Sequence, residues 1–198
     1  MWASRLHTCA LLSAIFLVSA QAHGTPRFSS RYTDLTQCPR MMPRNLPSGG
    51  APDGADSPIR CRGPGIYEVT ETYSAESTLR RVEAPTHSFS RDLLPIKAKC
   101  HVIEYGEKLE WRLANGVAFA VITRAWCYGE DPDAQGQYPN RKNVVGRYLL
   151  VRGLLGHATL GADIDVAEHS GESNRRAQEL ADQAFAGTSR DGTLNPQQ

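Results

Sequence analysis

The sequence lacks the short motifs that mark familiar enzyme classes. It contains no GxSxG nucleophile elbow, no SxxK pair, no HExxH zinc motif and no glycine-rich phosphate-binding loop. Its five cysteines include no CxxC pair, which disfavours a metal site. The absence of these motifs favours a protein that is not an enzyme and needs no cofactor.

The chain also lacks an excess of either charge and a long apolar segment. Lys and Arg together number 22, and Asp and Glu number 21. Arg5 is the only charged residue among residues 1–22, so the remainder carries 21 charges of each sign. No basic surplus is present to attract nucleic acid or anionic lipid. No stretch reaches the roughly 18 apolar residues of a transmembrane helix. We therefore expect no nucleic-acid partner and no membrane span in the mature chain.

The first 22 residues have the pattern of a secretory signal peptide. Arg5 precedes an apolar run over residues 9–18, which is too short to span a bilayer. Ser19, Ala20 and Ala22 then supply the small residues that a signal peptidase requires. The pattern predicts cleavage after Ala22 and a periplasmic or secreted protein.

Four cysteines remain after this cleavage, namely Cys38, Cys61, Cys100 and Cys127. An even number of cysteines in an exported chain favours two disulfides, for which three pairings are possible. Proximity in sequence favours Cys38–Cys61 and Cys100–Cys127. The second pair would close the base of a predicted β-hairpin.

That hairpin occupies residues 100–127 and turns on Asn115-Gly116, a dipeptide typical of a two-residue type I′ turn. Counting outward from the turn predicts a register and a shared apolar face for three residue pairs. These pairs are Leu113 with Ala118, Trp111 with Ala120, and Leu109 with Ile122.

Other segments complete an α+β fold with an antiparallel sheet of about five or six strands. Residues 66–73 and 78–82 are predicted to form a second hairpin, and residues 144–151 a buried strand. A helix starting at Ser170 or Ser173 and ending at Gly187 carries one apolar stripe that would pack on the sheet. The predicted organisation is a signal peptide (1–22), an irregular Pro/Gly-rich arm (23–64), an α+β domain (65–187) and a disordered tail (188–198). In the arm, Tyr32 and Leu35 are candidates for packing on the domain.

Several short motifs resemble those of a group of small exported proteobacterial proteins to which no activity is assigned. They are Tyr32-Thr33-Asp34-Leu35 before a cysteine, Cys61 before Gly65-Ile66-Tyr67, Glu110-Trp111-Arg112, and Asn174…Ala177…Leu180-Ala181-Asp182. The resemblance implies a periplasmic location and transfers no activity. The pair Cys100 and Cys127 and the loop after Gly129 look like additions to the group's pattern.

The predicted mature N-terminus offers one candidate metal ligand. Cleavage after Ala22 would place His23 first, and an N-terminal histidine can bind Cu(II) through its amine and its imidazole, as in a histidine brace. A second histidine would be required, from among His87, His101, His157 and His169. The alternative is that cleavage merely falls before a histidine in an irregular arm.

A second candidate lies in the polar loop 129–143. Asp131 and Asp133 occupy the first and third positions of a calcium-loop pattern, but Lys142 stands where a bidentate glutamate is needed. We therefore expect a solvated loop, which could serve as an interaction surface. His157, Asp163 and Asp165 share one face of the predicted strand 157–166, for which a solvated sheet face is likewise expected.

Two aromatic residues near the second cysteine pair are the remaining candidates. Trp126 and Tyr128 could form an exposed patch at the end of the hairpin, although packing beside the disulfide is the simpler interpretation. The leading hypothesis is a non-enzymatic periplasmic domain that binds a protein or an envelope component. The alternatives are a copper protein that uses His23 and an inhibitor of an exogenous hydrolase.

Overall fold

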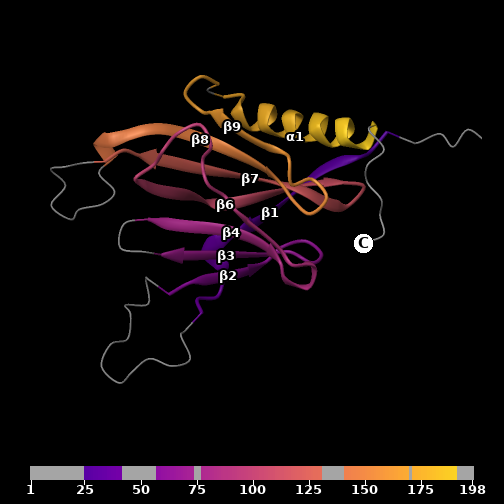
Figure 1. Ribbon diagram of the computed structural model, residues 1–198, viewed down its shortest axis with the longest axis horizontal. Helices are drawn as coiled ribbons and strands as arrows, with labels where there is room; N and C mark the ends of the chain where they lie inside the picture. The colour runs from indigo at the N-terminus through magenta and orange to yellow at the C-terminus, as the bar shows by residue number, and fades with distance from the viewer. Residues whose placement is uncertain (1–24, 42–56, 74–76, 131–140, 170, 191–198) are drawn as a thin grey trace, which may run out of the picture.

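The chain folds into three layers in a computed structural model, which describes residues 25–41, 57–73, 77–130, 141–169 and 171–190. A C-terminal helix lies on one face of a five-stranded sheet, and a four-stranded sheet covers the opposite face (Figure 1). The α+β class, the C-terminal helix and the antiparallel pairing are confirmed. Within the described residues, nine strands form two sheets, whereas the sequence predicted one sheet of five or six strands.

The five-stranded sheet has the order β1-β6-β7-β8-β9, and the four-stranded sheet has the order β2-β3-β4-β5. The strands of the first are β1 (Phe28–Asp34), β6 (Val102–Ala114), β7 (Val117–Tyr128), β8 (Val144–Gly153) and β9 (Gly161–Asp165). Those of the second are β2 (Ile59–Arg62), β3 (Glu68–Tyr73), β4 (Thr78–Ala84) and β5 (Phe89–Asp92). Short 3-10 helices occupy Leu35–Gln37, Pro85–His87 and Arg141–Asn143, and α1 spans Ser173–Arg190.

The central hairpin turns where the sequence predicts, but its register differs from the prediction. Asn115 and Gly116 have φ values of 51° and 85°, as a type I′ turn requires. Leu113 faces Ala118 as expected, and a bulge then shifts the pairing by one residue. The predicted partners Ala120 for Trp111 and Ile122 for Leu109 are therefore wrong, because their observed partners are Val121 and Thr123. The bulge directs Phe119 and Ile122 toward the helix and Val121 toward the second sheet.

Trp111 forms the centre of the core between the two sheets. Its side chain is fully buried, stacks on Tyr67 with ring centroids 5.9 Å apart, and donates from Nε1 to Thr33 Oγ1 at 2.9 Å. A Cβ atom on Gly63 would lie 2.5 Å from the indole, so glycine is required at this close approach. Trp111, which the sequence places on the apolar face of the hairpin, thus belongs to the core.

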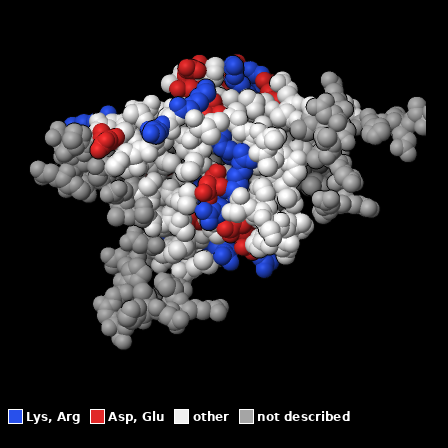
Figure 2. Space-filling model, in the orientation of Figure 1, with Lys and Arg blue, Asp and Glu red and all other residues white. Residues whose placement is uncertain are grey.

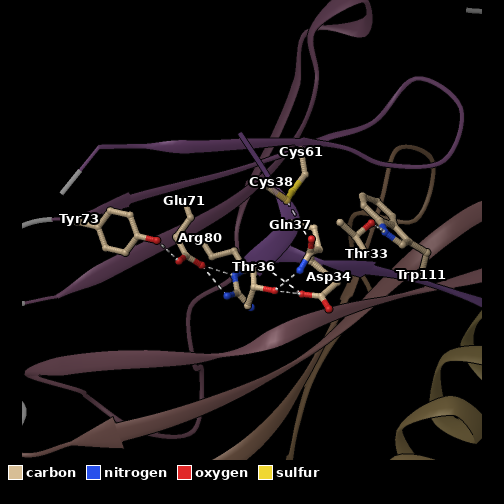
Figure 3. The surroundings of a disulfide bond; sticks show 10 residues. All are labelled: Thr33, Asp34, Thr36, Gln37, Cys38, Cys61, Glu71, Tyr73, Arg80 and Trp111. Carbon is tan, nitrogen blue, oxygen red and sulfur yellow. Dashed lines mark hydrogen bonds and ion pairs between the residues drawn. A yellow bond between two sulfur atoms is a disulfide. The ribbon is translucent and has the colours of Figure 1, made fainter. Parts of the chain in front are cut away.

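The predicted irregular arm, residues 23–64, contains two strands that belong to the fold. β1 is an edge of the five-stranded sheet, and β2 is an edge of the four-stranded sheet. Cys38, just after β1, forms a disulfide with Cys61 in β2 (Figure 3). Leu35 is buried as predicted, whereas Tyr32 is 61% exposed. The predicted boundary at Gly65 is therefore too late, because both edge strands precede it.

The second disulfide and the helix follow the predicted plan with one change. Cys100 pairs with Cys127 in β7, so both favoured pairings are confirmed.

α1 starts at Ser173 and packs on the sheet through the fully buried Ala177 and Ala181. It continues through Gly187 to Arg190, so the predicted helix end is wrong and residues 188–190 of the predicted disordered tail are helical. No helix among the described residues is long and apolar enough to cross a membrane.

Candidate functional site

The helix covers only part of its face of the five-stranded sheet. Under α1, Phe119, Leu149 and Val151 pack against the helix as a continuous apolar cluster. Beyond the N-terminal turn of α1 the sheet face is open, and a cleft of about 520 Å³ lies there. We call this the helix-end cleft. Its volume falls within the range of about 300–1,000 Å³ that is typical of ligand-binding clefts.

The helix-end cleft is lined by residues from four strands and the helix. β1 contributes Tyr32, β6 contributes residues 105–108 and 110, and β7 contributes residues 122–124 and 126. Leu149 of β8 and Asn174 of α1 complete the lining. The floor is apolar because Ile122 and Leu149 are both buried there. The cleft therefore has an apolar base where the helix packing ends.

Two aromatic side chains in the lining of the helix-end cleft are at least partly exposed to solvent. Tyr32 is 61% exposed, and Trp126 is half-buried. Gly106 lies in an irregular segment of β6, where pairing is interrupted between Tyr105 and Leu109. A Cβ atom on Gly106 would lie 3.2 Å from Arg124 Cβ and 3.7 Å from Trp126 Cζ3, so this segment approaches β7 closely. The irregular segment therefore places the backbone at Gly106 against Arg124 and Trp126.

The charges lining the helix-end cleft are balanced. Glu107 and Glu110 are acidic, and Lys108 and Arg124 are basic. Glu107, Lys108 and Arg124 are exposed, and Glu110 is buried. The cleft therefore offers both hydrogen-bond donors and acceptors without a net charge. Figure 2 likewise shows acidic and basic side chains interleaved over α1 and down the middle of the molecule.

A smaller cleft of about 290 Å³ continues along the same sheet face and shares Trp126. Glu104 and Arg147 are the cross-strand partners of Trp126 on its two sides, and both line this second cleft. Tyr128 is also in its lining, but its side chain is buried and its hydroxyl donates to Glu104 Oε2 at 2.5 Å. Tyr128 therefore packs as the simpler interpretation of the sequence expects, and the alternative of an exposed patch is wrong for Tyr128.

A hydrogen-bond network under the helix fixes one wall of the helix-end cleft. Glu110 Oε1 accepts from Ser30 Oγ at 2.5 Å and from Gln178 Nε2 at 2.8 Å. Arg112 donates to Ser30 Oγ at 2.6 Å and forms a two-bonded ion pair with Asp182, at 3.1 and 2.5 Å. Because these groups belong to β1, β6 and α1, the network holds the two strands and the helix in one arrangement.

Tyr32 stands beside this network as the cross-strand partner of Glu110. Partial desolvation by the surrounding protein, and secondarily the Glu110 carboxylate, raise the pKa of the Tyr32 phenol. The hydroxyl is therefore neutral at physiological pH and can donate a hydrogen bond. Its exposed ring is available for stacking.

Residues of the motifs noted in the sequence come together at this site. Tyr32 and Glu110 face each other across β1 and β6, Asn174 lines the cleft, and Arg112 pairs with Asp182 of α1. Sequence reasoning identified Trp126 but missed the cleft positions contributed by Lys108 and Arg124 and the role of Gly106. A glycine inside an otherwise regular strand pattern was the available signal, since such a glycine often marks a bulge.

The other candidates do not form a site. Asp163 is 3% exposed and pairs with the buried Arg152, and its Oδ2 accepts from the backbone N–H groups of Ile96 and Lys97 at 2.6 and 2.8 Å. His157 is also buried and lies against Phe185, with ring centroids 5.0 Å apart. The solvated face predicted for His157 and Asp163 is therefore wrong, and their roles are structural. Burial lowers the pKa of His157.

A third polar cluster lies between the sheets beside the first disulfide (Figure 3). Arg80 is 2% exposed, pairs with Glu71 and donates to Thr123 Oγ1 at 2.7 Å. Its guanidinium also lies 4.7 Å from the ring centroid of Tyr105. Burial and a hydrogen bond to Glu71 raise the pKa of Tyr73 to about 12. Arg80 therefore joins the two sheets through Thr123 and Tyr105, while Glu71 and Tyr73 hold its side chain within the four-stranded sheet.

No three His, Cys, Asp or Glu side chains gather closely enough to hold a metal ion in the part of the chain that the structure describes. His23, Asp131 and Asp133 lie outside the described residues. Comparisons of the chain with protein-family models, with curated proteins and with solved structures found no match. The candidate site therefore rests on the geometry of the helix-end cleft.

Proposed function

We propose that the chain is an exported, non-enzymatic binding protein that holds an envelope component in the helix-end cleft. The observation that carries this proposal is the open part of the five-stranded sheet. There, Tyr32 and Trp126 stand among balanced charges over an apolar floor. A cleft of this volume that combines an apolar floor with partly exposed aromatic rings and a few polar groups is typical of a binding site.

Two further features support the proposal. The N-terminal pattern of residues 1–22 favours export, and two disulfides suit an oxidising compartment. The residues that line the helix-end cleft include no serine, cysteine or histidine among those the structure describes, so no Ser–His or Cys–His pair lies there. The copper protein and the hydrolase inhibitor remain predictions from the sequence, since no contact among the described residues favours either.

The proposal is tested by ligand retention. The mature protein would be immobilised, incubated with a solubilised envelope fraction, washed, and eluted for mass spectrometry. We expect a component retained by the wild type and lost in Tyr32→Ala and Trp126→Ala. Ile96→Ala is the matched control, because Ile96 is 64% exposed and lies outside the helix-end cleft. Equal retention by wild type and cleft variants would reject the cleft as the binding site.

A further inference from the structure

We infer that the ligand of the helix-end cleft is a neutral oligosaccharide. This inference rests on the proposed function and adds the chemical class of the ligand. Three observations carry it, namely the arrangement of the aromatic side chains, the balance of charges, and the shape of the two clefts that share Trp126.

The aromatic side chains suit sugar rings. A pyranose presents C–H groups on its faces and hydroxyl groups around its rim, so it stacks on an aromatic ring while its rim forms hydrogen bonds. Tyr32 and Trp126 supply such rings. Among the aromatic side chains that the structure describes, Tyr32 is the most exposed, at 61%. Carboxylates beside them accept from hydroxyls, and Lys108, Arg124 and Asn174 donate to them.

The charge balance favours an uncharged ligand. Two acidic and two basic residues line the helix-end cleft, and the second cleft adds one of each, Glu104 and Arg147. A phosphorylated or polyanionic ligand would meet as many carboxylates as cations, and a polyamine would meet as many cations as carboxylates. A neutral polyol uses both signs through hydrogen bonds and incurs repulsion from neither.

The shape favours an oligomer over a single sugar. Ile122, Arg124, Trp126 and Tyr128 alternate along β7 on one face, so the first and last are about 20 Å apart by the rise of a strand. The two clefts lie along this line and meet at Trp126. A linear chain of several rings would occupy both clefts, with Trp126 under one of its central rings.

The same surface is poorly suited to an extended peptide or to an acyl chain. β7 is paired on both sides, with β6 and β8, so its backbone is not available to the N–H and C=O groups of a peptide strand. An acyl chain needs a wholly apolar lining, whereas three charged residues of the helix-end cleft are exposed. Oligosaccharide hydroxyls need only side-chain partners, which this face supplies.

The inference is tested by calorimetric titration of the mature protein with neutral tetrasaccharides of glucose, N-acetylglucosamine, mannose and galactose. Galacturonate and glucosamine tetrasaccharides serve as the anionic and cationic comparators. We expect one-to-one binding of at least one neutral probe, and binding of its charged counterparts that is at least about fivefold weaker. Tyr32→Ala should weaken binding by about fivefold to tenfold. Trp126→Phe should retain part of the affinity that Trp126→Ala loses, and Ile96→Ala should bind as the wild type does.

The outcomes separate this inference from the proposed function. If no neutral probe binds while cleft variants still lose another envelope component, the saccharide is rejected and the binding site stands. Tighter binding of a charged comparator rejects the neutral ligand. If neither probes nor envelope components depend on the cleft, both proposals fail. Recovery of cleaved tetrasaccharide would retain the ligand class and reject the non-enzymatic part of the proposed function.

Discussion

The two parts of one sheet face differ in what their side chains do. Under α1, the five-stranded sheet presents Phe119, Ala120 and Val151, which pack against Ala177 and Ala181 of the helix. Beyond the start of the helix, the same strands present Arg124, Trp126 and Arg147, which no helix among the described residues covers. Along β7 alone, the side chains on this face change from Phe119 and Ile122 to Arg124 and Trp126 within a few residues.

This difference shows where the fold gains its stability, and it separates that region from the surface at which we propose binding. The covered part removes apolar area from water, and each Å² buried stabilises the fold by about 25 cal/mol. The open part leaves an aromatic ring and charged groups in contact with solvent, which adds little to stability. Substitutions in the covered part should therefore lower the free energy of unfolding, and on our proposal those in the open part should change binding with little effect on stability.

The largest effect is expected from Ala177→Asp in the covered part. Ala177 is fully buried between α1 and the sheet, and an unpaired carboxylate there would lose its hydration. We expect the free energy of unfolding to fall by about 3–5 kcal/mol, measured by urea denaturation. Gln183→Asp, on an exposed position of the same helix, is the control and should change stability by less than about 0.5 kcal/mol. Equal effects would mean that α1 does not dock through Ala177.

The next effect concerns the ion pair that holds α1 beside the cleft. Asp182→Ala would remove the carboxylate that receives two bonds from the nearly buried Arg112. We expect a loss of about 1–3 kcal/mol. A double-mutant cycle with Arg112→Met isolates the pair itself. Glu179→Ala breaks the exposed pair with Arg175 and should cost less than about 0.5 kcal/mol. Independent effects of the two substitutions would contradict a direct coupling.

A smaller effect, dependent on pH, is expected from His157 near the helix C-terminal half. Burial lowers its pKa below the ordinary value of 6.5, so above pH 6.5 the imidazole is neutral in both folded and unfolded states. As the pH falls below 6.5, the unfolded state binds the proton first, and stability declines until the pH passes the lowered pKa. His157→Phe should flatten this slope between pH 7 and pH 5. Parallel slopes for wild type and His157→Phe would place the imidazole in solvent.

The smallest effect on stability is expected in the open part. Tyr32→Ala should change the free energy of unfolding by less than about 0.5 kcal/mol, since the ring is 61% exposed. The matched comparison is Phe119→Ala under the helix, which is 2% exposed and should cost about 3–5 kcal/mol. Urea denaturation of both variants measures the contrast directly. A large loss in Tyr32→Ala would make Tyr32 a structural residue.

Local patterns in the sequence predicted the elements whose partners are close in the chain. The turn at Asn115-Gly116, the hairpin that follows Gly65 and the helix from Ser173 were all found from such patterns. β1 was missed because FSSRYTD shows no clear alternation and its partner β6 lies about 80 residues away, as the bond from Ser30 to Glu110 illustrates. Pairing at that distance depends on tertiary packing, which no local pattern encodes.

The site was predictable only in part for the same reason. Trp126 was a candidate because it lies beside Tyr128 and the second disulfide, but Tyr128 is buried and its hydroxyl donates to Glu104. The one-residue shift at Phe119 and the irregular segment at Gly106 decide which side chains reach the cleft. A one-residue bulge reverses the sheet face toward which the later side chains of the strand point. The sequence gives only a weak indication of where such a bulge lies.

Fluorine NMR of the mature protein labelled with 5-fluorotryptophan would compare the core and the open sheet face in one spectrum. Trp111 is fully buried between the sheets and Trp126 is half-buried in the cleft, so each resonance controls for the other. Trp126→Phe assigns the two signals. On addition of the solubilised envelope fraction, we expect the Trp126 resonance to shift or broaden while the Trp111 resonance stays in place. A shift of Trp111 with an unchanged Trp126, or no change in either, would contradict a binding site in the helix-end cleft.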